Sequence, residues 1–156
     1  MVTQQVTIMR GLPGSGKSTY AKALVDAGKG RVKRISRDDF RLMLDNGTFE
    51  NVDENLVTVL RDHAIVAALN AGYDIVIDET NVVQKRIDQL VRVCERSGAD
   101  FDYTVEVIDT PIEECLRRNA LRTGPACVPE HAIRRMDQQW KEDDERLARG
   151  RRVPRP

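Results

Sequence analysis

GLPGSGKS at residues 11–18 is the stretch that decides how this 156-residue chain folds. Its spacing is the P-loop signature G-x-x-x-x-G-K-[ST], in which glycines let successive backbone N–H groups turn inward around an anion. In this pattern Lys17 bridges the terminal phosphates of a polyphosphate, and the Ser18 hydroxyl binds the Mg²⁺ that accompanies them. The helix that follows directs its positive N-terminal end at the same phosphates.

The residues on either side supply the strand and the helix that this motif requires. Residues 6–9 predict a short strand, and residues 19–28 predict a helix. We expect the buried face of that helix to carry Tyr20, Ala23, Leu24 and Ala27. The expected ATP-binding residues are Gly14, Ser15, Gly16, Lys17, Ser18 and Thr19.

Composition narrows the class of protein. The 25 basic residues equal the 25 acidic ones, so a wide duplex-binding surface, which is usually basic, is not expected. A small pocket that binds one strand end remains compatible with this balance. The three cysteines form no C-x-x-C pair, which favours reduced thiols over a metal or redox site. We expect a cytoplasmic protein without a membrane contact, because neither a signal segment nor an apolar run of membrane-spanning length is present.

Strand and helix patterns alternate along the rest of the chain, without an internal repeat or a linker. Further strands are predicted at residues 31–36, 75–77 and 101–109. Further helices are predicted at residues 38–44, 54–71, 83–97, 110–122 and 130–149. This alternation is typical of an α/β fold with about four parallel strands and helices on both faces. We expect the first and third strands at the centre of the sheet.

Two of these helices carry more specific expectations. The helix at residues 54–71 has an apolar stripe that favours a packed rather than a catalytic role for its histidine, and the stripe comprises Leu56, Leu60, His63 and Ala67. At the start of the helix at residues 110–122, Thr110 is the expected N-cap and Glu113 its capping-box partner.

Three polar segments follow the first three predicted strands, at residues 15–18, 37–41 and 78–81. Ligands of parallel sheets collect beyond the carboxyl ends of the strands, so we expect these segments to meet. Asp38 and Arg41 are three residues apart and share a helix face. This carboxylate could accept a proton from an attacking hydroxyl, and the arginine could hold a nearby phosphate through two hydrogen bonds. The same residues could instead cap the helix and form a surface pair.

Two further groups could complete a phosphoryl-transfer site. Asp78 follows an apolar strand and resembles a Walker B acid, which supports Mg²⁺ directly or through water. Arg118 and Arg122 are four residues apart on one helix face, and lid arginines of P-loop kinases offset charge on the transferring phosphate. The alternatives are a strand-end turn with Asn81 as a helix N-cap, and a solvated basic face.

The order of the motifs resembles that of the phage polynucleotide 5′-hydroxyl kinases. Five motifs over residues 5–140 carry the resemblance: G-x-P-G-S-G-K-S-T, R-D-D-[FY]-R, D-x-T-N, R-N-x-x-R and V-P before the last helix. It implies a P-loop NTPase fold with an arginine-bearing lid. It also implies Mg²⁺-dependent transfer of the ATP γ-phosphoryl group to the 5′-hydroxyl end of single-stranded DNA or RNA, as in end healing for repair.

The resemblance also implies a role for each matching residue. Lys17 and Ser18 correspond to phosphate and Mg²⁺ ligands, and Asp78 to the acid of the D-x-T-N segment. Asp38 corresponds to the general base, and Arg41 to the residue that contacts the phosphate on the 3′ side of the acceptor nucleoside. Catalytic roles on the donor side fall to Lys17, Arg118 and Arg122.

The chain departs from many such kinases because it contains no D-x-D-x-T, so a phosphatase domain is not expected. We expect a P-loop kinase domain over residues 1–149 and a basic, disordered tail over residues 150–156. Two other functions share the P-loop: a kinase of small molecules such as nucleosides or antibiotics, and an NTP-dependent switch or binding module without kinase activity.

Overall fold

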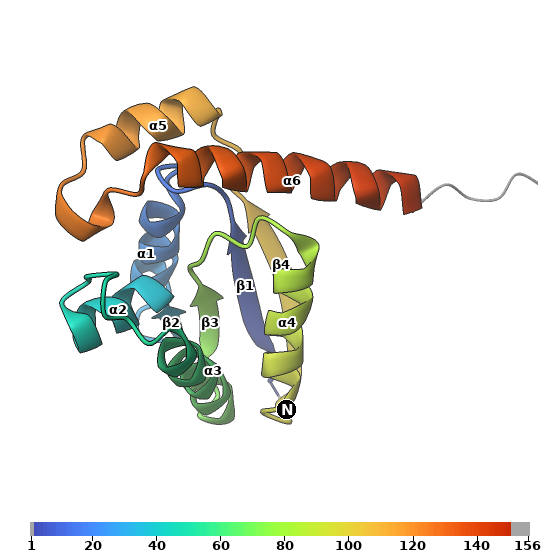
Figure 1. Cartoon of the computed structure of the whole chain (residues 1–156). Helices are drawn as coiled ribbons and strands as arrows, with labels where there is room; N and C mark the ends of the chain where they lie inside the picture. Colours follow the sequence, from blue (N-terminus) through green and yellow to red (C-terminus); the bar gives the residue numbers. More distant parts are fainter. Residues whose placement is uncertain (1, 151–156) are drawn as a thin grey trace, which may run out of the picture.

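The computed structural model describes residues 2–150, which form a four-stranded parallel sheet with helices packed around it (Figure 1). The strands are β1 (Gln4–Arg10), β2 (Val32–Ile35), β3 (Asp74–Ile77) and β4 (Phe101–Val107). The helices are α1 (Lys17–Ala27), α2 (Arg37–Asp45), α3 (Glu54–Asn70), α4 (Gln84–Glu95), α5 (Ile112–Ala120), the 3₁₀ turn η1 (Gly124–Ala126) and α6 (Glu130–Gly150). The strand order β2-β3-β1-β4 confirms a parallel sheet with the first and third strands at its centre.

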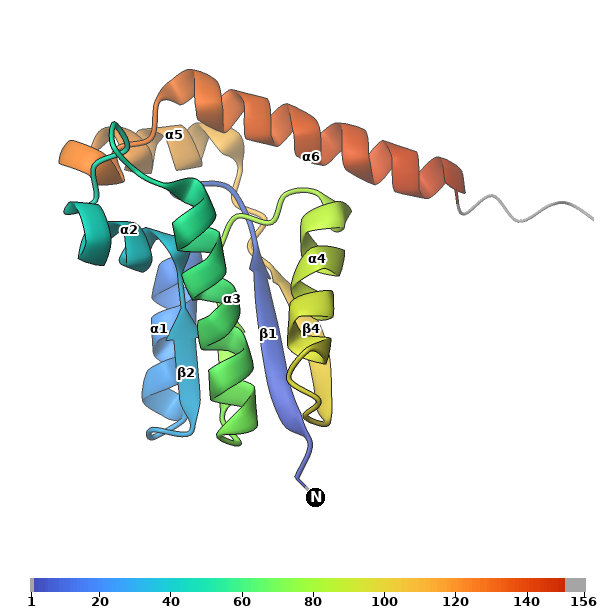
Figure 2. The same cartoon turned by 60° about the horizontal axis from the view of Figure 1, so that its bottom comes forward.

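Strand β3 explains why the sheet is covered on both faces. Its apolar residues alternate in direction, because successive strand side chains point to opposite faces. Ile75 and Ile77 belong to the core cluster built with α3 and α4, whereas Val76 packs with Ala21 of α1. Figure 2 shows α3 and α4 on one side of the sheet and α1 on the other. The expectation of helices on both faces is therefore confirmed.

Helices α5 and α6 lie across the carboxyl ends of the central strands (Figure 1). Their buried contacts include Leu12 of the P-loop, Val82 after β3, Cys115 of α5 and Ile133 of α6. This second core cluster closes the end of the sheet at which ligands of such folds collect.

The buried face of α3 differs from the predicted one. The residues that are buried are Val57, Arg61, Ile65 and Leu69, whereas Leu56 and His63 are exposed. Arg61 is buried because it pairs with Glu79 beyond β3. Since a charged residue lies in the middle of the buried face, the pattern of apolar residues does not identify that face. The prediction that His63 is packed was wrong, since its Nδ1 lies 2.8 Å from the Val59 carbonyl on the exposed side of the helix.

The predicted face of α1 was also wrong in part. Ala21 is buried and Leu24 packs against the same cluster, whereas Tyr20, Ala23 and Ala27 are exposed. This helix has apolar residues on more than one side, so periodicity alone does not choose its inner face. Its rotation is set by the P-loop, because the helix begins at Lys17.

Helix α5 begins later than predicted and without the expected cap. Pro111 occupies the N-cap position, and Thr110 Oγ1 instead donates a hydrogen bond to the Ser15 carbonyl at 2.8 Å. Thr110 therefore ties the start of this segment to the P-loop. The helix ends at Ala120, so Arg122 lies in the connection that follows.

Helix α6 extends to Gly150, one residue into the predicted tail, and residues 151–156 lie outside the described residues. No helix within residues 2–150 combines the length and the apolar composition that a bilayer span requires.

Ile65→Ala is expected to lower the free energy of unfolding by about 2–5 kcal/mol, because Ile65 is fully buried between α3 and the sheet. Leu56→Ala is the matched control and should cost less than about 1 kcal/mol, because Leu56 is 44% exposed. Denaturant unfolding followed by circular dichroism measures both. Equal losses would reinstate the predicted face of α3.

Candidate active site

The P-loop connects β1 to α1 and has the backbone geometry of an anion nest. Gly14 and Gly16 have φ values of 83° and 105°, in the left-handed region that favours glycine. A Cβ atom on Gly14 would lie 2.5 Å from the Cys115 carbonyl oxygen, so the approach of α5 also requires glycine there. The Ser15 hydroxyl oxygen is buried without a hydrogen-bond partner among the described residues. A phosphate oxygen in the nest would supply that partner.

Lys17 is the buried cation of this loop. Its Nζ donates a hydrogen bond to the Leu12 carbonyl at 2.7 Å, which closes the loop over the lysine. Burial lowers the pKa of Lys17 from 10.5 to about 8, although the nearby carboxylate of Asp78 favours the charged form. A polyphosphate in the nest would favour the ammonium form again.

The magnesium-binding roles predicted for Ser18 and Asp78 are compatible with their positions. Ser18 is exposed in the first turn of α1, and Asp78 is buried at the end of β3, where Arg34 pairs with it at 2.7 Å. Residues 2–150 contain no cluster of three or more acidic, histidine or cysteine ligands. This donor set fits Mg²⁺ because the ion keeps several waters and binds through phosphates and one or two protein oxygens.

The acceptor side of the site is built on α2. Arg41 Nη1 donates a hydrogen bond to Asp38 Oδ1 at 2.6 Å, so the two residues share a helix face as predicted. The remaining donors of Arg41, Nε and Nη2, bind both carboxylate oxygens of Glu54 at 2.7 and 2.9 Å. Arg37 also pairs with Glu54, and these hydrogen bonds lower the pKa of Glu54, that from Arg41 most strongly. Sequence reasoning missed Glu54, which local pattern presents only as an acidic residue in the first turn of α3.

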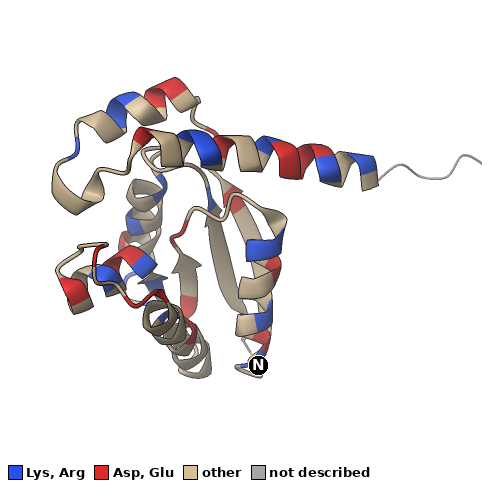
Figure 3. Cartoon of the chain, viewed as in Figure 1, with Lys and Arg blue, Asp and Glu red and all other residues tan. Residues whose placement is uncertain are grey.

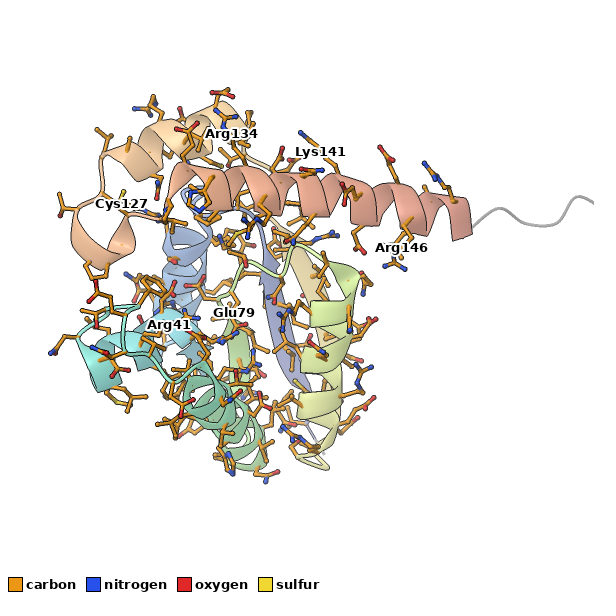
Figure 4. All side chains as sticks on the ribbon, viewed as in Figure 1. Arg41, Glu79, Cys127, Arg134, Lys141 and Arg146 are labelled. Atoms are coloured by element: carbon orange, nitrogen blue, oxygen red, sulfur yellow. The ribbon has the colours of Figure 1, made fainter. Side chains whose placement is uncertain are left out.

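A second ion pair joins α3 to the segment that follows β3. Arg61 Nη1 donates to both carboxylate oxygens of Glu79, at 2.8 and 2.9 Å. Figure 4 shows Glu79 and Arg41 in the same region beyond the carboxyl ends of β2 and β3. Burial raises the pKa of Glu79, and Arg61 opposes that rise. Glu79 is therefore an anchor for Arg61, which the sequence did not indicate.

Asn81 does not cap α4, as one alternative had it. Its Nδ2 donates a hydrogen bond to the Met9 carbonyl at 2.9 Å, and its φ of 44° is left-handed. The residue at the N-cap position of α4 is Val83, without a side-chain cap. Asn81 thus ties the end of β3 to the end of β1, next to the P-loop.

The arginine-bearing segment at α5 lies over the P-loop. Arg118 Nη1 donates to the Ser15 carbonyl at 3.3 Å, and its Nε donates to Glu114 at 2.7 Å. Hydrogen bonds from Arg117 and Arg118 lower the pKa of Glu114 to about 2. Arg122 is exposed, but its charge helps to lower the pKa of Lys17. Arg118 therefore contacts the phosphate-binding loop directly, whereas Arg122 affects it through its charge alone.

Asn119 fixes the connection that follows α5, and sequence reasoning missed it. Its Nδ2 donates to the Val128 carbonyl at 2.7 Å, and the Val128 N–H donates to its Oδ1 at 2.9 Å. These two bonds span the segment that contains η1. The asparagine is buried, so the segment is anchored at both ends.

The pKa of Lys17 is affected by three of the other predicted site residues. The charges of Asp78, Asp38 and Arg122 all act on its amine, from the ends of β3, from α2 and from the segment after α5. A family model described as an AAA domain matches residues 6–142, which includes all of these groups. The chain belongs to this AAA domain family.

Two curated proteins are similar to this AAA domain. A protein of Autographa californica nuclear polyhedrosis virus, predicted to be a bifunctional polynucleotide kinase/RNA ligase, is 27% identical over 135 residues, which are 78% of this chain and 18% of that protein. The 2′,3′-cyclic-nucleotide 3′-phosphodiesterase of Pongo abelii is 31% identical over 107 residues, which are 65% of this chain and 23% of that protein. The chain therefore spans less than a quarter of the length of either relative.

Solved structures share the fold of this AAA domain. A chain of the Pnkp1/Rnl/Hen1 RNA repair complex matches it with a TM-score of 0.79 and 27% identity, over 94% of this chain and 47% of that chain. The Mycobacterium tuberculosis APS kinase matches with a TM-score of 0.59 over 78% of this chain and 71% of that chain, at 22% identity, which shows the fold alone. The P-loop NTPase fold and the resemblance to polynucleotide kinase domains are thereby confirmed.

Binding of a nucleoside triphosphate to this AAA domain at roughly pH 9 is expected to take up a proton. The folded-state pKa of Lys17 is about 8, so the amine is mostly neutral at that pH, and phosphate charge favours the ammonium form. Below the folded-state pKa the amine is already charged, so the uptake should fall as the pH is lowered towards 7. Titration calorimetry in two buffers of different ionisation enthalpy measures this exchange.

Two variants separate Lys17 from the other lysines. Lys22→Met changes an exposed residue of α1 and should leave the uptake unchanged. Lys17→Met should weaken binding and remove the uptake. An uptake that is absent from the wild type at roughly pH 9, or that persists in Lys17→Met, would refute the assignment to Lys17.

Proposed function

We propose that this AAA domain transfers the γ-phosphoryl group of ATP to the 5′-hydroxyl end of single-stranded DNA or RNA. The observation that carries the proposal is the direct pair between Asp38 and Arg41, whose carboxylate is close enough to the buried Lys17 of the P-loop for its charge to raise the pKa of that lysine. A general base joined to a phosphate-binding arginine suits a hydroxyl acceptor that carries its own phosphate nearby. The similarity to the viral polynucleotide kinase/RNA ligase and to the RNA repair complex supports the same acceptor.

The donor half of the site binds and orients ATP. The glycine nest, the Ser15 hydroxyl and Lys17 hold the phosphates, and Ser18 and Asp78 would hold Mg²⁺. When bound, Mg²⁺ offsets negative charge on the β- and γ-phosphates. Arg118 lies beside the Ser15 carbonyl and can turn to the transferring phosphoryl group without leaving α5. These groups make most of the catalysis positional and electrostatic.

The acceptor half activates and positions the hydroxyl. The oxygen of the 5′-hydroxyl attacks the γ-phosphorus, the bond between that phosphorus and the β–γ bridging oxygen breaks, and ADP leaves. Asp38 accepts the hydroxyl proton, which its exposed carboxylate can do without refolding of α2. Arg41 binds the phosphate on the 3′ side of the acceptor nucleoside in place of, or together with, the Glu54 carboxylate. Every proton and bond in the transfer is then accounted for by the two substrates and Asp38.

The proposal predicts that label moves from γ-³²P-ATP to 5′-hydroxyl DNA or RNA oligonucleotides, but not to the same oligonucleotides with a 5′-phosphate. Asp38→Asn should lower kcat by about 10²- to 10⁴-fold and leave the Kd for ATP unchanged, because the base acts only in the chemical step. Asp45→Asn, at the other end of α2, is the matched control and should keep wild-type turnover.

Either of two results would contradict this assignment. Wild-type turnover in Asp38→Asn would remove the residue from the mechanism. ATP binding without any labelled oligonucleotide would favour a small-molecule kinase, to be tested with nucleosides and antibiotics as acceptors.

Arg41→Ala is expected to raise KM for the 5′-hydroxyl oligonucleotide by about 10- to 100-fold, because two charge-assisted hydrogen bonds to its phosphate are lost. KM for ATP should change much less, since Arg41 lies on α2 and not in the P-loop. Arg31→Ala, which removes a pair with Asp74 at the other end of the sheet, is the control for a general loss of charge. Equal increases in both KM values for Arg41→Ala would contradict its acceptor role.

A further inference from the structure

The connection between α2 and α3 holds a phenylalanine beside the acceptor arginine. Phe49 is 57% exposed, which alone indicates nothing, because single exposed apolar residues are common. The guanidinium carbon of Arg41, however, lies 5.4 Å from the centroid of the Phe49 ring. This is the distance of a cation–π contact, so one face of the ring adjoins the arginine while much of the side chain stays open to solvent.

Hydrogen bonds to two carboxylates hold Arg41 in place beside this ring. Its Nε and Nη2 bind Glu54 at the start of α3, and its Nη1 binds Asp38 on α2. The guanidinium is therefore held in place by carboxylates, with its central carbon over the ring of Phe49. Phe49 consequently adjoins the group to which the acceptor phosphate is assigned.

The same connection also approaches the segment after α5. Asn46 and Gly47 have φ values of 52° and 75°, which produce a tight turn directly after α2. A Cβ atom on Gly47 would lie 3.5 Å from Pro125 of η1. Phe49 thus lies in a short connection that begins at the end of α2, and the turn of this connection adjoins η1, the segment after α5.

We propose that Phe49 stacks on the base of the acceptor nucleotide whose 3′-side phosphate Arg41 binds. The inference rests on the proposed function for that phosphate and adds the contact that recognises the nucleoside. A nucleotide carries its base close to its own phosphate, and the ring adjoins the phosphate-binding group. Stacking on an aromatic ring tolerates any base, because every base has a π-face. The site would therefore take nucleic-acid ends of any sequence and disfavour hydroxyl compounds without a base.

Equilibrium binding tests the contact separately from catalysis. The two ligands are a fluorescent 5′-hydroxyl trinucleotide and the same trinucleotide with an abasic 5′-terminal residue, each with Mg²⁺ and a non-hydrolysable ATP analogue. The wild type should bind the base-bearing ligand about 5- to 150-fold more tightly. Phe49→Ala should lose that preference by weakening only the base-bearing ligand, and Phe49→Trp should keep it.

Tyr103→Ala removes an exposed aromatic residue of β4, at the other edge of the sheet, and should leave both Kd values unchanged. Equal weakening of the two ligands in Phe49→Ala, or equal binding of both by the wild type, would overturn the stacking proposal. Base-dependent binding without transfer of phosphate would instead overturn the proposed function and leave the stacking contact standing.

Discussion

The parallel pairing of β3 with both β1 and β2 is the constraint on which the candidate site depends. The register aligns Ile8 with Ile77 and Ile35 with Ile77, so β2 and β3 end at the same level and β1 continues beside them for two more residues. The P-loop, the start of α2 and Asp78 follow those ends directly, and this brings together segments that are far apart in the sequence. A shift of the β3 register by one residue would move Ile75 and Ile77 away from the core beneath α3 and α4 to the opposite face of the sheet. The buried apolar run of β3 therefore fixes the geometry of the polar groups beyond it.

Charge in this region is balanced locally and not accumulated over a surface. Arg41 pairs with Glu54, Arg118 with Glu114 and Arg34 with Asp78. Figure 3 shows basic and acidic residues interleaved along α6, and an acidic start and a basic end on α5. A phosphate that binds to Arg41 or Arg118 must therefore share the arginine with a carboxylate or replace it. Such an exchange suits a site that binds one phosphate at a defined place, and it explains how a chain of zero net charge could still hold phosphates.

Sequence reasoning succeeded where a local pattern carries its own chemistry. The P-loop, the central places of the first and third strands and the shared face of Asp38 and Arg41 follow from motif spacing and from helix or strand periodicity. It failed where a distant residue decides the outcome. Arg61 is buried in an ion pair with Glu79, and Thr110 donates a hydrogen bond to the Ser15 carbonyl and does not cap α5. Neither partner is visible in the local pattern.

The central claim is that an acceptor with a 5′-hydroxyl lies between Asp38 and the γ-phosphate of ATP. A crystal structure with Mg²⁺, a non-hydrolysable ATP analogue and a 5′-hydroxyl trinucleotide tests it most directly. We expect the 5′ oxygen within hydrogen-bond distance of Asp38 and in line with the γ-phosphorus, with the adjacent phosphate on Arg41. A trinucleotide bound away from α2, with Arg41 still engaged only by Glu54 and Asp38, would contradict it.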